Sequence, residues 1–103
     1  MVVILWEFVP KSGSERQFEA AYGSRGVWAR LFQKGKGYLG SELIKDTDST
    51  RYLTIDRWAS EEDHRAFQTQ YADEYKRIDG QCELLTQSEK FLGIFSSVEI
   101  LSH

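Results

Sequence analysis

The sequence predicts an α+β domain in which two helices cover one face of a four-stranded antiparallel sheet. Three observations predict this fold. Strand-like and helix-like segments follow one another in the order strand, helix, strand, strand, helix, strand. The short polar turn Asp46–Ser49 separates the second and third strands and predicts a hairpin. Two helices cover only one face of such a sheet. The order is the ferredoxin-like βαββαβ pattern, a split βαβ unit that is repeated.

Four segments are expected to be strands. The first, Val2–Val9, is rich in β-branched and aromatic residues and is closed by Pro10. The others run over 38–46, 51–58 and 91–101.

Alternation along the second and third strands predicts which side chains share a face. In strand 38–46 we expect Leu39 and Leu43 on one face, and on the other Tyr38, Glu42 and Ile44. In strand 51–58 we expect Leu53 and Ile55 on one face, and on the other Tyr52, Thr54, Asp56 and Trp58.

Two segments have apolar residues at helical spacing. The first spans about 14–33 behind a capping box, Ser12–Glu15 or Ser14 with Gln17, and we expect it to bend or split near Ser24. The second follows the capping box Ser60–Asp63 and ends at Gly80. Its apolar face carries His64, Phe67, Tyr71, Tyr75 and Ile78. Residues 81–88 are a candidate for a further short helix.

The first and last strands are apolar on both faces, although two helices leave one face of the sheet uncovered. The simplest cover for that face is a second copy of the chain, related by a two-fold axis. We therefore expect a homodimer that forms through the sheet.

Size and charge exclude several classes of protein. At 103 residues and 11.9 kDa, the chain has room for one domain over 1–103. Its net charge of −3 argues against nucleic-acid binding. A basic cluster stands out at Arg25, Arg30, Lys34 and Lys36. We interpret this cluster as a solvated helix face, with an anion-steering patch as the alternative.

Cysteine use and the apolar runs set the expected location. Cys82 is the only cysteine, so no internal disulfide forms and a buried structural thiol is expected. The apolar run Val2–Trp6 is too short for a signal peptide or a membrane span. We therefore expect a cytoplasmic protein that does not bind membranes.

Two motif matches carry little weight. Residues 35–40 match G-x-G-x-x-G, but a helix precedes them and a strand follows, which reverses the order that a dinucleotide site needs. Lys36–Tyr38 begins like an RNA-recognition motif, but it opens the second strand rather than the third.

His64, His103 and Cys82 lack the paired spacing of metal ligands, so no metal is expected.

His64 is the most informative titratable residue, because it lies in the first helical turn on the same face as Phe67 and Tyr71. A neutral imidazole at an aromatic cavity can act as an acid, a base or a hydrogen-bond donor near pH 7. The alternative is an interfacial histidine that covers the start of the helix. Asp56 is either a buried base or, as we expect, the partner of Arg57 or Arg51 in a solvated ion pair.

Two segments resemble antibiotic biosynthesis monooxygenase (ABM) domains. Residues 51–60, RYLTIDRWAS, together with Glu61, Glu62 and Phe67, resemble the family's segment of strand, Trp, x, Ser and helix. Gly37–Ser41 resembles the glycine-and-aromatic opening of its second strand. The order of elements matches over nearly the whole chain.

The resemblance implies a dimeric α/β barrel with a pocket between sheet and helices in each protomer. For some members it implies oxygenation of polycyclic aromatic compounds without metal or flavin, in which the substrate anion itself reduces O₂ and the protein supplies a dry, oriented pocket. It also implies a site at the residues that match the family's pattern. The candidate catalytic residues are Thr54, where these members carry an Asn, and His64, where they carry an aromatic hydroxyl. The candidate substrate-binding residues are Trp58 and Tyr52, as pocket walls, and five aromatic residues at helical spacing that are either pocket lining or, by default, plain core: Tyr22, Trp28, Phe32, Phe67 and Tyr71.

Three functions follow as hypotheses. The first is a cofactor-independent monooxygenase that acts on a small quinol- or anthrone-like compound. The second is a non-catalytic or stress-associated dimer that binds a small molecule. The third, haem binding, is disfavoured because haem-degrading members use an Asn on the first strand and this chain contains no Asn. Glu7 or Trp6 takes that position, while Phe67 and Arg77 stand where those members carry Trp and His.

Overall fold

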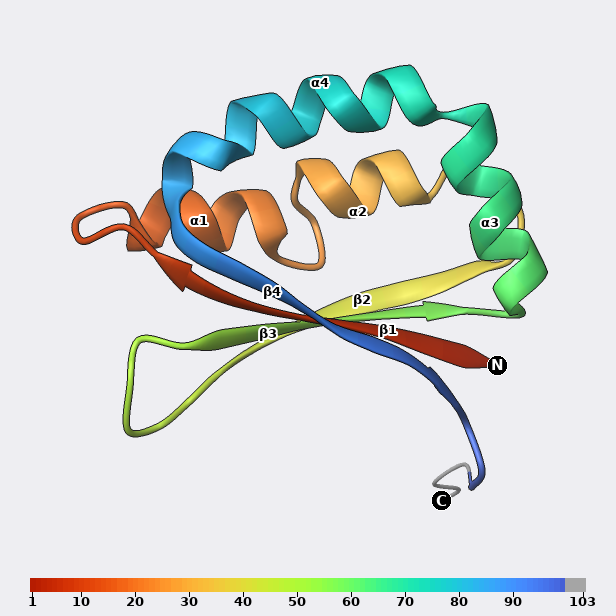
Figure 1. Ribbon diagram of the computed structural model, residues 1–103, viewed down its shortest axis with the longest axis horizontal. Coiled ribbons are helices and arrows are strands. Elements are labelled where there is room, and N and C mark those ends of the chain that lie inside the picture. Colours follow the sequence, from red (N-terminus) through yellow and green to blue (C-terminus); the bar gives the residue numbers. More distant parts are fainter. Residues whose placement is uncertain (100–103) are drawn as a thin grey trace.

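The computed structural model describes residues 1–99 and confirms the ferredoxin-like α+β fold, with every helix on one side of the sheet (Figure 1). The elements are β1 (Val2–Pro10), α1 (Glu15–Tyr22), α2 (Val27–Phe32), β2 (Tyr38–Lys45), β3 (Tyr52–Trp58), α3 (Glu61–Gln70), α4 (Ala72–Cys82), the 3₁₀ turn η1 (Glu83–Leu85) and β4 (Thr86–Ser96). Among the described residues, no helix is long and apolar enough to cross a membrane.

The sheet has the strand order β2-β3-β1-β4, and every neighbouring pair is antiparallel. β1 and β3 are therefore central, and for β1 this agrees with its apolar residues on both faces. Leu5 pairs with Ile55 and Trp6 pairs with Thr54 across these strands. Paired residues share a face, so the even-numbered side chains of both strands face the helices and the odd-numbered ones face away.

The expected faces of β2 are wrong at one end, because the strand carries a bulge. Tyr38 pairs with Trp58, whereas Gly40 pairs with Arg57, so Leu39 is an extra residue. One extra residue reverses the alternation. Tyr38 therefore lies on the helix side together with Leu43, and Leu39 is exposed.

The first helical segment splits at the predicted place. Gly23 ends α1 by donating its backbone N–H to the carbonyl oxygen of Glu19 at 2.9 Å. At Gly26 the chain passes so near α1 that a Cβ would lie 2.2 Å from the carbonyl oxygen of Ala21. The chain turns there and begins α2, which brings Trp28 and Leu31 into the core.

The second helical segment, expected as one helix ending at Gly80, is two helices that meet at Tyr71. Tyr71 has φ −112° and ψ 26°, and its hydroxyl donates to the carbonyl oxygen of Lys34 at 3.2 Å. This contact with the segment after α2 fixes the break. Gly80 does not end the helix, because α4 continues to Cys82, which is buried. The predicted N-cap of α3 is confirmed, with Ser60 Oγ accepting from the Asp63 backbone N–H at 3.1 Å.

β4 begins at Thr86, five residues before the expected start. Of the short helix expected over 81–88, residues 81–85 are helical, as the end of α4 and η1, whereas 86–88 belong to β4. Its polar first half pairs with the second half of β1 at an exposed edge, where polar side chains are common. The strand ends at Ser96; of the expected strand 91–101, Ile100 and Leu101 lie outside the described residues.

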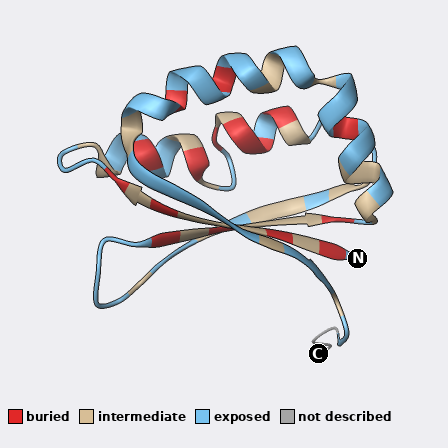
Figure 2. Ribbon diagram, viewed as in Figure 1, coloured by how far each residue is buried: buried red, intermediate tan, exposed pale blue. Residues whose placement is uncertain are grey.

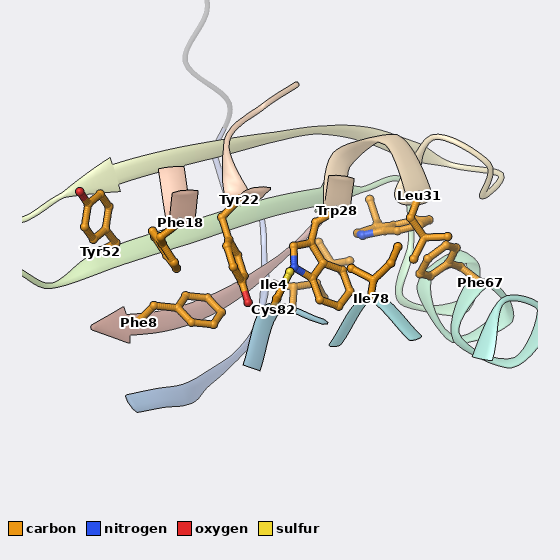
Figure 3. Close-up of a cluster of buried hydrophobic side chains, with 12 residues drawn as sticks. Ile4, Phe8, Phe18, Tyr22, Trp28, Leu31, Tyr52, Phe67, Ile78 and Cys82 are labelled. Atoms are coloured by element: carbon orange, nitrogen blue, oxygen red, sulfur yellow. The ribbon is translucent and has the colours of Figure 1, made fainter. Parts of the chain in front are cut away.

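The core between helices and sheet is built from aromatic rings (Figure 3). Phe18 stacks on Tyr22 with ring centroids 4.4 Å apart, and Phe8 lies 4.7 Å from Tyr22. Trp58, Phe67 and Phe18 are fully buried. Burying rings of this size is a large source of hydrophobic stabilisation.

The opposite face of the sheet carries no helix (Figure 2). Val3, Leu5, Leu53 and Ile55 are only partly buried there, and at the sheet edges Ile44 is 41% and Phe95 49% exposed. Within the described residues, no helix or strand covers the apolar centre of this face, which is bordered on the same side by Glu7, Glu42 and Arg57.

Candidate functional site

Two adjoining hollows lie between the helix layer and the sheet. The smaller has a volume of about 50 Å³ and the larger of about 320 Å³. They adjoin, because they have four wall residues in common: Trp6, Phe32, Asp56 and Tyr75.

The smaller hollow lies over the centre of the sheet, beneath α1, α2 and α4. Besides the shared residues, its walls are Phe8, Tyr22, Trp28, Ala29, Ser41, Thr54, Asp79 and Glu89. The aromatic members come from the core cluster shown in Figure 3, where Tyr22 and Trp28 lie beside Cys82. Burial is the main cause that raises the pKa of the Tyr22 phenol, so this phenol stays neutral at physiological pH.

The larger hollow extends toward α3 and the far part of β4. Its further walls are Ile4, Trp58, His64, Gln68, Phe91 and Ile94. Phe91 is 49% and Ile94 40% exposed, because no helix covers this part of β4. The smaller hollow is also reached by solvent, because its wall residues Asp79 and Glu89 are exposed.

Asp56 occupies the floor where the two hollows meet. The Ser41 hydroxyl donates to Asp56 Oδ1 at 2.6 Å, and the Tyr38 hydroxyl lies 2.5 Å from Ser41 Oγ. Within residues 1–99, the other carboxylate oxygen of Asp56 accepts no hydrogen bond. Burial raises the pKa of Asp56 to about 6, an effect that the bond from Ser41 partly offsets. A carboxyl group with this pKa is suited to proton transfer near neutral pH.

The expected ion pair of Asp56 is wrong. Arg57 binds Glu42, and Arg51 binds Glu7 and Asp46. Alternation along β3 explains this, because Asp56 faces the helices whereas Arg57 faces away.

His64 lies at the wall of the larger hollow, with its ring centroid 5.4 Å from that of Trp58. Burial lowers the pKa of the imidazole, although Glu61 opposes the shift. The ring is therefore neutral near pH 7, and its buried Nδ1 has no hydrogen-bond partner within residues 1–99. Thr54, 7% exposed, lines the smaller hollow on the same face of β3 as Asp56.

The hollows bring together six of the nine residues proposed from the sequence. Thr54, Tyr22 and Trp28 line the smaller hollow, His64 and Trp58 line the larger one, and Phe32 lines both. Neither hollow is lined by Tyr52, Phe67 or Tyr71.

These three residues are occupied elsewhere. Tyr52 donates its hydroxyl to Glu19 and packs against Phe18. Phe67, 2% exposed, packs between Trp58 and Phe32. Tyr71 holds the end of α2 through Lys34.

Sequence reasoning missed Trp6, Tyr75, Asp79 and Glu89 as wall residues. Trp6 could have been predicted, because the even-numbered residues of β1 lie on the face of the sheet that the helices cover. Tyr75 lies on the predicted apolar helix face, whereas Asp79 and Glu89 look like ordinary surface acids in the sequence.

In the part of the chain that the structure describes, no three His, Cys, Asp or Glu side chains are arranged to hold a metal ion. Cys82 is buried, and burial raises the pKa of its thiol, which disfavours the nucleophilic thiolate.

The chain is similar to a known protein family and to several solved structures. A family model described as antibiotic biosynthesis monooxygenase, ABM, matches residues 1–78. No curated protein matches the chain. Among solved structures, the chain is similar to SnoaB from Streptomyces nogalater, described as a cofactor-independent oxygenase, with 20% identity, a TM-score of 0.74, and 99% of this chain and 97% of that chain covered.

A second solved structure is equally close in fold. MhuD, in a variant with two manganese protoporphyrin IX molecules bound per active site, has 18% identity and a TM-score of 0.77, and both chains are covered completely. Similarity at these identities shows a shared fold.

Proposed function

The chain belongs to the antibiotic biosynthesis monooxygenase (ABM) family, and from this membership we propose that it is a cofactor-independent monooxygenase acting on a small aromatic compound of the quinol or anthrone type. The observation that carries the proposal is the carboxylate of Asp56. One of its oxygens is held by Ser41, and the carboxylate lines both aromatic hollows. The likeness to SnoaB is consistent with this chemistry.

The proposed reaction begins with proton transfer from the substrate to Asp56. The resulting aromatic anion transfers one electron to O₂, and the two radicals combine to form a C–O bond. The peroxide takes up a proton and loses water, which leaves a carbonyl group. If the substrate is written AH₂ and the product A=O, the overall reaction is AH₂ + O₂ → A=O + H₂O. One oxygen atom enters the product and the other is reduced to water.

The neighbouring residues have supporting roles in this proposal. Ser41 and Tyr38 are positioning residues that hold Asp56 through two successive hydrogen bonds. Thr54 and the neutral His64 supply polar contacts for substrate oxygens. The rings of Trp6, Phe32 and Trp58 exclude water and provide flat walls for an aromatic substrate.

Replacing Asp56 by Asn tests the base, because the amide keeps the shape of the side chain but takes up no proton. We expect oxygen uptake with anthrone, corrected for the rate without protein, to fall by about 10²–10⁴-fold. The wild-type rate should rise with pH through about 6, the raised pKa of Asp56. Asp48→Asn in the exposed β2–β3 turn removes the same charge and should keep the full rate.

Two outcomes contradict the proposal. Uptake by Asp56→Asn at the wild-type rate excludes Asp56 as the base. Quenching of tryptophan fluorescence by anthrone without any oxygen uptake favours the second candidate, a non-catalytic binding protein. Unchanged uptake by the His64→Ala, Thr54→Ala double variant removes those two residues from the mechanism while leaving Asp56 in place.

We also propose that two chains pair through the helix-free face of the sheet. Support comes from the partly buried Leu5 and Ile55 at its centre and from the exposed Ile44 and Phe95 at its edges. An apolar surface of this kind favours association with a matching surface.

A further inference from the structure

The charged residues of the site have only one sign. Asp56, Asp79 and Glu89 line the hollows, and no lysine or arginine within residues 1–99 contributes to either wall. The carboxylates come from three elements, β3, α4 and β4, so the chain brings them together only by folding.

These carboxylates also lack cationic partners in the described part of the chain. Its lysine and arginine ion pairs involve Glu74, Glu7, Asp46, Glu42 and Glu61, and none involves a carboxylate of the hollows. Asp56 has one oxygen without a hydrogen bond at the floor. The negative charge of the site is therefore uncompensated by side chains.

The effect of this charge reaches the surrounding groups. Burial and the nearby Asp79 and Glu83 raise the pKa of Glu89. Burial raises the pKa of Tyr75 to about 12, with further contributions from Asp79, Asp56 and Glu89. Groups on α4 and β4 thus lie in a negative field that opposes any further negative charge.

Aromatic faces surround the same space. The smaller hollow is walled by the rings of Trp6, Phe8, Tyr22, Trp28, Phe32 and Tyr75. Ring faces attract cations through their quadrupole, and carboxylates attract them directly. The combination of rings with unpaired carboxylates is the chemistry that recognises an organic ammonium ion.

We propose that the ligand of this site is an aromatic compound that carries a protonated amino group. Its rings lie in the larger hollow, and its ammonium group lies in the smaller one between Asp79, Glu89 and the aromatic walls. The inference rests on the proposed function for the position of the site but not for its charge preference. The proposed oxygenation passes through a substrate anion, and no cationic side chain lines the hollows within residues 1–99. The ammonium group of the substrate itself therefore balances the developing negative charge.

Isothermal titration of the whole chain with three naphthalene compounds of closely similar size tests the charge preference. We expect naphthylmethylammonium to bind about tenfold more tightly than the neutral naphthylmethanol, with naphthylacetate the weakest. Glu89→Gln and Asp79→Asn should each weaken binding of the ammonium compound by about threefold and leave the alcohol unaffected. The alcohol therefore reports whether each variant keeps its fold, and Asp48→Asn should change neither affinity.

Equal or tighter binding of the alcohol or the acetate overturns the inference, and so does an ammonium affinity that survives replacement of both acids. The titration involves no turnover. A failure of the charge preference is therefore distinct from a failure of oxygenase activity, which the Asp56→Asn assay reports.

Discussion

The alternation of side chains along a strand decides which face of the sheet each residue of this chain occupies. In β3, the alternation that buries Tyr52 and Trp58 also turns Thr54 and Asp56 toward the helices. Asp56 is thereby removed from the arginines next to it in sequence and receives only the hydroxyl of Ser41. Burying a carboxyl group in this setting costs stability, and the proposed role as a base gives a reason for the fold to keep it.

That cost predicts a pH-dependent effect of Asp56→Asn on stability. The native-state pKa of Asp56, about 6, lies above its ordinary value of 3.8, so the native state holds the proton more tightly than the unfolded chain. Its contribution to stability is thus fully present below about pH 4 and is lost as pH rises through about 6. Since this difference between the native-state and the ordinary pKa corresponds to about 3 kcal/mol, the variant should be more stable than wild type at pH 7.5 by up to that amount.

Urea unfolding of both proteins at pH 7.5 and pH 4, at one fixed protein concentration, measures this difference. The stabilisation should be present at pH 7.5 and nearly absent at pH 4, where the wild-type carboxyl is neutral in the native state. A variant that is less stable than wild type at pH 7.5 would show that the native structure favours the ionised carboxylate.

At the scale of elements, the N-terminus of α3 gives a clean prediction. Ser60 Oγ accepts the backbone N–H of Asp63, whereas Ser14 at the start of α1 makes no such side-chain bond. Ser60→Ala should therefore lower the free energy of unfolding by about 1 kcal/mol, while Ser14→Ala should change it by much less. Urea unfolding checks both variants, and equal losses would mean that the cap bond contributes nothing specific.

The order of elements could be predicted from the sequence because each depends on local signals. Glycines marked the gap between α1 and α2, and the Ser60 capping box marked the start of α3. The bulge at Leu39 and the break at Tyr71 carry no local signal. The first depends on how β2 pairs with β3, and the second on a contact with Lys34, so both arise only when distant segments meet.

The candidate site divides in the same way. Phe32 and His64 are candidates because helical spacing places them on apolar faces, and Trp58 is a candidate because it matches the Trp of the ABM pattern. Asp56 was assigned to solvent because its arginine neighbours in sequence suggested an ion pair, and only the sheet register shows that they face apart. Asp79 and Glu89 belong to α4 and β4, and no sequence pattern relates two exposed acids on separate elements.

For the whole molecule, the layered fold separates two surfaces with different tasks. The hollows lie between the helices and the sheet. The surface proposed for pairing is the side of the sheet that carries no helix in Figure 2. Adjacent residues of β1 and β3 therefore alternate between the two surfaces. Substitutions at odd-numbered positions should affect association while leaving the walls of the site in place.

Ile55→Glu tests this separation, because Ile55 pairs with Leu5 at the centre of the helix-free face. A carboxylate there loses its water if two such faces meet, at a cost of several kcal/mol for an unpaired charge. Light scattering during size exclusion should give twice the chain's 11.9 kDa for wild type and the single-chain mass for the variant. Leu84→Glu, in η1 and 71% exposed, makes a comparable change away from that face and should keep the wild-type mass. Association through this face would be refuted by a wild-type mass of one chain or by an Ile55→Glu variant that still pairs. A monomeric Ile55→Glu variant that still binds naphthylmethylammonium would show that the pairing surface and the hollows act independently.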